Sequence, residues 1–437
     1  MRRLLALTLT ASVVSLASFM PVTALAAPDK LILAGQLLEV QSGRLKANRA
    51  ILLEQDRIHD IVPIASLTAE QKALPSTDLT GYTVLPGLID MHVHLTANPA
   101  QHGYRRLQQT PARQALFGVT AAKATLEAGF TTVRNLGAAG FADVDLRDAI
   151  NAGEIPGPRM RVSGPSLCMT GGHCDNNLLP HTYQASGDGV ANGADAIRAK
   201  VRSNMKYGAD VIKFTATGGV LSRNTDVNAS QYSLAEMQAL VAEAKDRGAI
   251  VAAHAHGLRG IKRALEAGVD SIEHASFIDD DAIKLAKRNG TYLVMDIYVS
   301  DYILQEGEAA GILPESLAKE RTVGQLQRQN FSKAVKAGLN IAYGTDAGVY
   351  THGLNARQFN YMVQWGMTPL QAIQSATVNA ATLLNWRNEQ GQLNVGVLQA
   401  GAYADMIAVK GNPLEHITLL EAIPVVIKGG EVVKQPN

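Results

Sequence analysis

The central part of the chain repeats one pattern, in which an amphipathic helix is followed by a glycine and then by an apolar strand. Gly129, for example, precedes the apolar residues 130–135, and a glycine at this place ends a helix in the left-handed conformation. Helix starts are marked by capping boxes at Ser233 and Thr368. Apolar strands between helices predict a parallel sheet that is covered on both faces.

The pattern supplies eight strands, at residues 84–94, 130–135, 161–166, 209–214, 250–254, 271–274, 291–295 and 340–346. An α/β fold with a closed (β/α)8 TIM barrel accounts for this count. An open, doubly wound sheet is the alternative.

Both ends of the chain contain short strands without intervening helices, at residues 30–35 and 49–54 and again at 404–409 and 424–430. Neither end is long enough to form a core alone, so the two are predicted to be halves of one small β-sandwich. The expected domains are therefore a barrel at 85–388 and a β-sandwich built from 27–84 and 389–437.

The first residues have a different character. Arg2 and Arg3 precede an apolar stretch at 4–20, which is followed by small residues at 24–27. A basic start, an apolar core and an A-x-A site predict a signal peptide over residues 1–26, with a membrane anchor as the alternative. For a bacterial protein, export would place the mature chain in the periplasm or outside the cell.

Composition argues against several classes of partner. The formal net charge is +1 and aromatic residues make up 5% of the chain, so no nucleic-acid surface is predicted. We expect neither a nucleic acid nor a membrane as a partner. Cys168 and Cys174 can form a disulfide in an oxidising compartment or remain two free thiols, and the sequence leaves both possibilities open.

Polar side chains capable of binding metal occur at the C-terminal ends of the predicted strands, where barrel enzymes place their active sites. His92 and His94 lie two residues apart on one strand, so both point to the same face. Two neutral imidazoles at this spacing form half of a site for a metal such as zinc. The other strand-end residues are Lys213, His254, His256, His274 and Asp346. Each has an ordinary structural explanation alone, but together they predict a metal centre.

These motifs resemble those of the amidohydrolase superfamily of metal-dependent hydrolases, and the resemblance covers essentially the whole mature chain. The matching segments are 86–94, 251–256, 268–274 and 344–346, together with Lys213. The resemblance implies two divalent metal ions, with zinc expected and manganese or cobalt tolerated. His92, His94 and Asp346 would bind the more buried ion, and His254 and His274 the more exposed one.

In this family Lys213 would be carbamylated by CO2, and its new carboxylate would bridge both ions. An ammonium would repel two cations, whereas a carbamate supplies two oxygens and a negative charge. A mononuclear site is the alternative. Two such ions lower the pKa of a shared water. Asp346 would then act as the catalytic residue, taking the proton of this nucleophile and passing it to the leaving nitrogen.

Within the superfamily, the chain looks most like bacterial carboxypeptidases of the Xaa-Pro dipeptidase type and like ochratoxin-hydrolysing amidohydrolases. The residues that carry this likeness are 170–173, 217–223 and 231–236. Such enzymes release an amino acid from a dipeptide or an N-acyl amino acid, and ochratoxin A is a phenylalanine amide with a free carboxylate. Its cleavage would give ochratoxin alpha and phenylalanine.

A small-molecule or dipeptide substrate with a free carboxylate needs a cationic or hydrogen-bonding clamp. The candidate substrate-binding residues are His173, Arg223, Tyr232, His256 and Tyr298. Residues 295–298 stand where relatives often have a Pro-Thr pair, so this side of the pocket departs from the family pattern.

Two other classes remain as alternatives. A cyclic-amide hydrolase or deaminase of the imidazolonepropionase type often uses one metal and lacks the bridging lysine, so Lys213 argues against it. A barrel retained only as a scaffold would have lost metal ligands, whereas this chain has all six expected ones. The resemblance also implies a symmetric homo-oligomer, with an octamer as one form.

Overall fold

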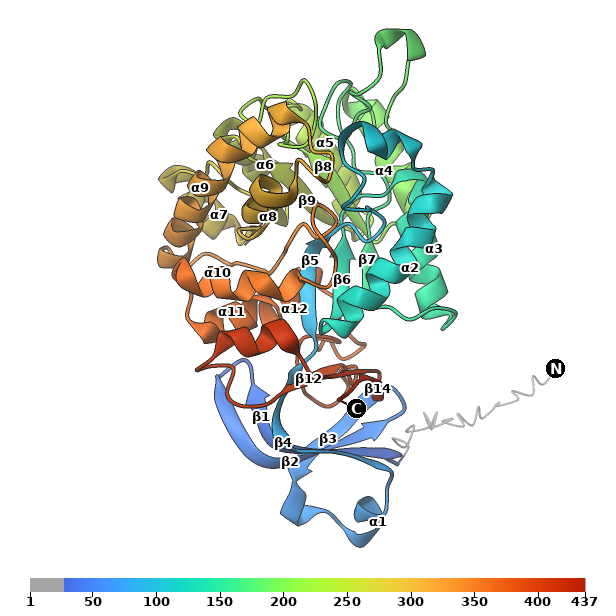
Figure 1. The fold of residues 1–437 in the computed structure, drawn as a ribbon, viewed down its shortest axis with the longest axis vertical. Coiled ribbons are helices and arrows are strands. Elements are labelled where there is room, and N and C mark those ends of the chain that lie inside the picture. The colour runs from blue at the N-terminus through green and yellow to red at the C-terminus, as the bar shows by residue number, and fades with distance from the viewer. Residues whose placement is uncertain (1–26, 437) are drawn as a thin grey trace, which may run out of the picture.

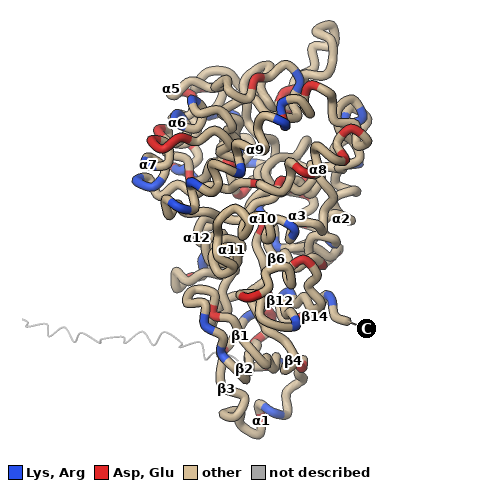
Figure 2. The backbone as a smooth tube through the Cα atoms, turned by 60° about the vertical axis from the view of Figure 1, so that its left-hand side comes forward, with Lys and Arg blue, Asp and Glu red and all other residues tan. Residues whose placement is uncertain are grey.

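The computed structural model describes residues 27–436, so the predicted signal peptide lies outside the described residues. The chain forms a helix-covered barrel with a smaller β-domain beneath it (Figure 1). Between residues 27 and 436, no helix combines the length and the apolar character needed to cross a bilayer. Lys and Arg are intermixed with Asp and Glu over both parts (Figure 2), in keeping with the net charge of +1.

The β-domain is one seven-stranded sheet with the strand order β14-β13-β12-β4-β1-β2-β3. Strands from the two ends of the chain meet where Pro86 of β4 pairs with Met406 of β12. The strands are β1 (Lys30–Glu39), β2 (Arg44–Glu54), β3 (Arg57–Pro63), β4 (Ser76–Pro86), β12 (Met406–Val409), β13 (Val425–Lys428) and β14 (Glu431–Lys434).

This sheet curls over on itself. Ile58 of β3 donates its backbone N–H to the carbonyl of Ala402, and Arg57 pairs with Tyr403, just before β12. The enclosed face buries side chains from both chain ends, among them Ile51 and Ile427. The two ends therefore share one apolar core, as expected of the two halves of a β-sandwich.

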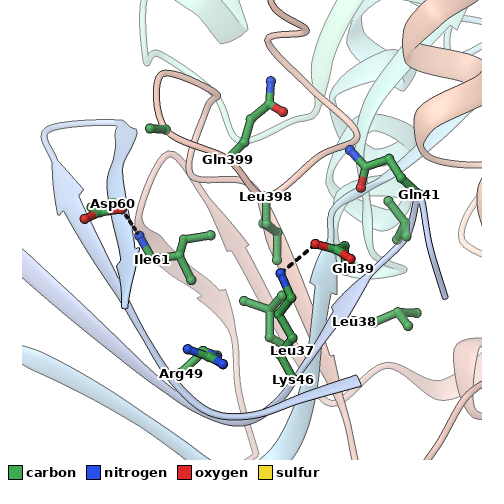
Figure 3. A pocket seen from close by; sticks show the side chains of 12 residues that line it. Leu37, Leu38, Glu39, Gln41, Lys46, Arg49, Asp60, Ile61, Leu398 and Gln399 are labelled. Atoms are coloured by element: carbon green, nitrogen blue, oxygen red, sulfur yellow. Dashed lines mark hydrogen bonds and ion pairs between the residues drawn. The ribbon is translucent and has the colours of Figure 1, made fainter. Parts of the chain in front are cut away.

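A separate cavity of about 300 Å³ lies in the β-domain (Figure 3). It is lined in part by Leu37, Gln41, Arg49 and Leu398. None of the lining residues is one of the predicted site residues, so this cavity is distinct from the predicted active site.

The barrel strands run parallel and close around an apolar core. They are β5 (Leu88–Val93), β6 (Phe130–Asn135), β7 (Arg159–Val162), β8 (Val211–Thr215), β9 (Ile250–Ala255), β10 (Ser271–His274) and β11 (Tyr292–Val294). Leu167 pairs with Phe214 and joins β7 to β8. Residues 341–347 close the ring, because Ile341 pairs with Leu293 and Ala347 pairs with Val93. The predicted closed barrel is confirmed.

Three predicted strands differ in detail from the structure. The segment 84–94 is divided between β4 and β5 at Gly87, where an added Cβ would lie 2.0 Å from Thr131 Oγ1. The strand predicted at 161–166 is β7, which begins two residues earlier and ends at Val162. In place of a regular strand at 340–346, the structure has isolated bridges at Ile341 and Ala347, and Asp346 lies in the left-handed region with φ 57°. Asp346 is at the end where the predicted metal ligands gather.

Helices cover the outside of the barrel (Figure 1). The capping boxes predicted at Ser233 and Thr368 are both formed, and Gly268 and Gly290 end α6 and α7 with φ of 86° and 69°. The barrel helices are α2 (Pro111–Glu127), α3 (Ala142–Asn151), α4 (Ala194–Lys206), α5 (Leu234–Lys245), α6 (Leu258–Ala267), α7 (Asp280–Asn289), α8 (Val299–Glu306), α9 (Pro314–Lys336), α10 (Gln358–Gln364), α11 (Pro369–Ser375) and α12 (Val378–Leu384). The short α1 (Ala69–Lys72) belongs to the β-domain.

Candidate active site

Histidine rings from β5, β9 and β10 meet at the C-terminal end of the barrel strands. The ring centroids of His92 and His274 lie 5.0 Å apart, and those of His254 and His274 lie 4.6 Å apart. His94 directly follows β5 and packs edge-on against His92 at 5.2 Å. The structure thus brings together the four histidines that the sequence singles out as metal ligands.

The possible ligand atoms form three overlapping groups, and within each group all atoms lie within 4.8 Å of one another. The groups are His92, His94 and Asp346; His254, His256 and His274; and His274, Asp296 and Asp346. Because His274 and Asp346 each belong to two groups, the donors form one continuous cluster.

His92 is held between two carboxylates. Its Nδ1 lies 3.1 Å from Glu273 Oε2, and its Nε2 lies 3.4 Å from Asp346 Oδ1. Glu273 is itself fixed, because its Oε1 accepts a hydrogen bond from Arg134 Nη2 at 2.8 Å. Among the described residues, neither His92 Nδ1 nor Glu273 Oε2 forms a hydrogen bond with good geometry, so Glu273 is a close carboxylate neighbour on one side of the ring, while Nε2 on the other side faces Asp346.

His274 also lies against a carboxylate. Its Nδ1 lies 2.8 Å from Asp296 Oδ1, which also accepts a hydrogen bond from Gln327 Nε2 at 2.7 Å. The backbone of His274 has φ 70° and that of Asp346 has φ 57°. Such strained conformations cost of order 1–3 kcal/mol each and cluster at active sites.

Lys213 on β8 is 3% exposed and lies within electrostatic reach of this cluster. Burial lowers the pKa of its ammonium to about 8, although Glu273 and Asp346 act in the opposite direction. Burial and then the charge of Lys213 lower the pKa of His92 well below its ordinary value. The lysine is therefore at a place where a positive charge is disfavoured by burial.

The lowered pKa values of His254 and His256 suit metal binding. Burial is the main cause that lowers the pKa of His254, and it does the same for His256. Burial also opposes the charged form of His274, but Asp296 raises the pKa of this ring. Neutral imidazole is the form that binds a metal ion, and imidazole with carboxylate ligands suits zinc, manganese or cobalt. The donor set therefore fits divalent metal ions.

Two predicted substrate-binding residues adjoin the cluster. His173 stacks on His254 with ring centroids 4.3 Å apart, and its Nδ1 lies 2.7 Å from Ser222 Oγ. His256 stacks on His274 at 4.8 Å, and its Nδ1 lies 2.8 Å from Ser276 Oγ. Both rings are thus fixed beside the metal-binding histidines.

The structure corrects the expectation for Tyr232. This side chain is 1% exposed, and its hydroxyl donates a hydrogen bond to the carbonyl of Ala191 at 3.0 Å. Its ring also packs near Phe214, with centroids 6.3 Å apart. Tyr232 is a core residue, because its polar atom is already satisfied inside the protein.

Arg223 and Tyr298 lie outside the histidine cluster. Arg223 is partly exposed, contacts the hydroxyl of Tyr104 and has Nε 3.8 Å from Glu315. Tyr298 is buried, and its hydroxyl accepts a hydrogen bond from Arg357 Nη1 at 3.1 Å. Within residues 27–436, no hydrogen bond or ring contact joins either side chain to the cluster, so their contact with a substrate stays a prediction.

The loop that carries His173 is closed by a disulfide between Cys168 and Cys174, which resolves the alternative that the sequence left open. The backbone N–H of His173 donates to Gln231 Oε1 at 3.0 Å. An added Cβ on Gly219 would lie 2.2 Å from the His173 ring, so only glycine allows this approach. The loop therefore holds His173 from several sides.

Sequence reasoning missed the residues that support the ligands. These are Asp296 beside His274, Glu273 beside His92, and Arg134, which is bound to Glu273. Asp296 follows the predicted strand 291–295 directly, and Arg134 is a charged residue within an apolar strand. These positions are the signals that could have identified them.

Comparison with known proteins shows which family has this arrangement. Residues 83–433 match the model of the amidohydrolase family. The chain is 33% identical over 431 residues to the ochratoxinase of Aspergillus niger, which covers 93% of this chain and 87% of that one.

Solved structures give the same result. A Xaa-Pro dipeptidase with methionine bound in its active site is 40% identical, with a TM-score of 0.82 and coverage of 93% of this chain and 99% of that one. A prolidase complexed with N-methylphosphonate-L-proline is 30% identical, with a TM-score of 0.84 and coverage of 93% and 100%. The chain therefore belongs to the amidohydrolase family and is a metal-dependent hydrolase of amide or peptide bonds.

Proposed function

We propose that the protein is a binuclear metal-dependent carboxypeptidase, which cleaves the C-terminal amide bond of dipeptides or N-acyl amino acids. The observation that carries this proposal is the continuous cluster of His92, His94, His254, His274 and Asp346 around the buried Lys213. Its likeness to an ochratoxinase, a Xaa-Pro dipeptidase and a prolidase supports a substrate with a free carboxylate. Ochratoxin A, cleaved to ochratoxin alpha and phenylalanine, has the required chemistry.

The ligand set divides into two parts that share one lysine. His92, His94 and Asp346 would hold one ion, and His254 and His274 the other, with zinc as the expected metal. Carbamylation of Lys213 would replace a cation among these ligands by a carboxylate that can bridge both ions. When bound, the ions would supply a nucleophilic water near neutral pH and polarise the amide carbonyl.

The side chains of the protein would perform the remaining tasks. Asp346, whose Oδ1 lies 3.1 Å from His94 Nε2, would accept the proton of the nucleophile and donate it to the leaving nitrogen. Glu273 and Asp296 would keep the ligand rings in place. His173 and His256 would contact the substrate beside the exposed ion, since both rings stack on its ligands.

The proposal also includes the cellular location and the oligomeric state of the protein. We infer export to the periplasm or the medium from the signal-peptide pattern at residues 1–26, and a symmetric homo-oligomer from the family resemblance. Size-exclusion chromatography with light scattering and fractionation of expressing cells test these two points.

The central experiment measures release of free amino acid from dipeptides, N-acyl amino acids and ochratoxin A by zinc-loaded and by chelated enzyme. We expect release that depends on metal and on a free terminal carboxylate. Metal analysis of the gently purified protein, with two ions per chain expected, tests the binuclear site. Activity confined to cyclic amides or aminated heterocycles would instead assign the imidazolonepropionase-type alternative.

A further inference from the structure

A short helical turn covers one side of the barrel mouth. The 3-10 helix η2 (Gly103–Gln108) follows β5 and is anchored to the loop between α8 and α9 and to the loop that follows Asp346. His102 donates its backbone N–H to the carbonyl of Ala310 at 3.2 Å, and its Nε2 lies 2.9 Å from the carbonyl of Val349. η2 therefore has a defined position over the site.

Three consecutive side chains of η2 have different surroundings. Tyr104 contacts Arg223 through its hydroxyl, and Arg105 Nη1 donates to the carbonyl of Ala309 at 3.0 Å. Both side chains therefore fasten η2 to neighbouring loops. For Arg106, in contrast, the part of the chain that the structure describes offers neither a hydrogen-bond acceptor nor a carboxylate, and burial alone lowers its pKa.

The contacts of η2 place Arg106 on the side of His173. Ser222 Oγ lies 2.7 Å from His173 Nδ1, and Arg223, the next residue, contacts the hydroxyl of Tyr104 in η2. The charge of Arg106 agrees with this placement, because it contributes, after larger causes, to lowering the pKa values of His102 and His173. The Arg106 side chain is also solvent-exposed, although enough protein surrounds it to lower its own pKa by desolvation. Arg106 is therefore an exposed cation on η2, at the rim of the site and on the side of His173.

The carboxylates of the site already have partners. Glu273 is bound to Arg134, Asp296 to His274 and Gln327, and Asp346 lies against His92 and His94. Among the described residues Arg106 has no ionic partner, so its guanidinium is available to an anion that enters the site. A guanidinium matches a carboxylate with two parallel hydrogen bonds.

We propose that Arg106 binds the free terminal carboxylate of the substrate and so makes this hydrolase specific for C-terminal residues. The inference rests on the proposed carboxypeptidase function and adds a residue that the sequence did not single out. The substrate would extend from the metal cluster past His173 to Arg106. η2 is then a specificity element, because its anchors at His102 and Arg105 hold Arg106 at the rim of the site.

The test compares each substrate with its carboxamide. The variants are Arg106→Gln, Arg106→Lys and the control Arg113→Gln, which removes an exposed charge from the neighbouring α2. The probes are N-acetyl-L-phenylalanine and N-acetyl-L-phenylalaninamide. We expect Arg106→Gln to lower kcat/KM for the free acid by about 10- to 150-fold, the effect of losing a charged hydrogen bond, mainly through KM. Arg106→Lys should restore part of this loss.

The carboxamide supplies the decisive contrast. Its kcat/KM should stay within about twofold in every variant, because it has no charge for Arg106 to bind. An equal loss on both probes would mean that Arg106 only supports the site, and no loss on the free acid would also overturn the proposal. The parental enzyme tests the proposed function separately, since it must release phenylalanine from the free acid when loaded with metal.

A binding measurement tests the role of Arg106 separately from the hydrolytic activity of the enzyme. Isothermal titration of N-acetyl-L-phenylalanine into the chelated enzyme, which does not turn it over, should give a Kd that rises in Arg106→Gln and is unchanged in Arg113→Gln. Equal Kd values in the parental protein and Arg106→Gln, or no binding to either, would overturn the role of Arg106 whatever the enzyme hydrolyses.

Discussion

The β-domain cavity and the barrel mouth both collect charged side chains, but they satisfy these charges in opposite ways. In the β-domain, Lys46 and Arg44 surround Glu39 with donors at 2.6 and 3.0 Å, and Lys46 is the main cause that lowers the pKa of this carboxyl to about 2. Figure 3 shows the pair of Lys46 and Glu39. At the barrel mouth, burial lowers the pKa of Lys213 to about 8, and Arg106 has no anionic partner among the described residues.

The difference distinguishes a structural site from a functional one. Charges that neutralise each other within the chain need no ligand, whereas a buried lysine and an unpaired arginine near a cluster of possible metal ligands are groups that a ligand can complete. Size does not make this distinction, because the β-domain cavity of about 300 Å³ contains none of the clustered metal donors.

The largest effect should come from changing a residue that the metal cluster needs. Lys213→Ala or Asp346→Asn should reduce turnover about 10³-fold or more while the barrel remains folded, as checked by kinetics and circular dichroism. Glu39→Gln in the β-domain serves as the matched control and should leave turnover unchanged. Substantial activity in either cluster variant would contradict the binuclear mechanism.

Metal removal should also lower the Tm of the protein, and this loss should depend on residues of the barrel and not on residues of the β-domain. A metal ion that binds only the folded chain adds about 2.7 kcal/mol at a concentration of about 100 times its Kd, so the Tm should fall on chelation. His94→Ala should reduce this metal-dependent shift. His59→Ala, which removes a β-domain histidine 3.4 Å from Glu54, should retain it in full. An equal loss in both variants would place the stabilising metal outside the barrel mouth.

A supporting residue should have a smaller effect. Asp296→Asn removes the carboxylate behind His274 and should weaken metal binding by about 10- to 100-fold, measured by competition with a chelating dye. Asp301→Asn is the control, because Asp301 is paired with Arg328 at 2.7 Å instead of with a histidine of the cluster. Unchanged metal affinity in Asp296→Asn would remove Asp296 from the metal site.

The smallest effect should come from the β-domain ion pairs. Because the folded pKa of Glu39 is about 2 and its ordinary value is 4.5, its pairing stabilises the protein above pH 4.5, and this contribution is lost as the pH falls towards 2. Glu39→Gln should therefore cost at most about 1 kcal/mol at pH 6 and less at pH 3, since the pair is at the surface. Urea unfolding at the two pH values measures the difference, and a larger cost at pH 3 would contradict it.

Features with a local or periodic signature could be predicted from the sequence. The capping box at Ser233 and the glycine cap at Gly268 depend on a few neighbouring residues, and both are formed. The two-residue spacing of His92 and His94, at the end of an apolar strand, likewise predicts one shared face. The parallel barrel could likewise be predicted, because the pattern of helix, glycine and apolar strand repeats along the chain.

Features that depend on distant contacts could not be predicted in this way. Tyr232 looked available to a substrate, but its partner, the carbonyl of Ala191, lies 41 positions away in the chain. Arg105 and Arg106 are adjacent in the sequence, and only the folded structure distinguishes them, because Arg105 donates to the carbonyl of Ala309 whereas Arg106 has no such partner among the described residues. Asp346 was predicted as a ligand, yet its left-handed backbone conformation has no signal in the sequence.

The pairing of β4 with β12 has a consequence for how the protein is made. Thr83 to Pro86 pair with Met406 to Val409, so the β4 edge emerges from the ribosome long before its partner is synthesised. During that interval the edge has unpaired backbone groups that can recruit other chains. Truncation of the final strands would make this exposure permanent. A nascent chain of this protein therefore needs protection, by a chaperone or by delayed folding, until its last residues are available.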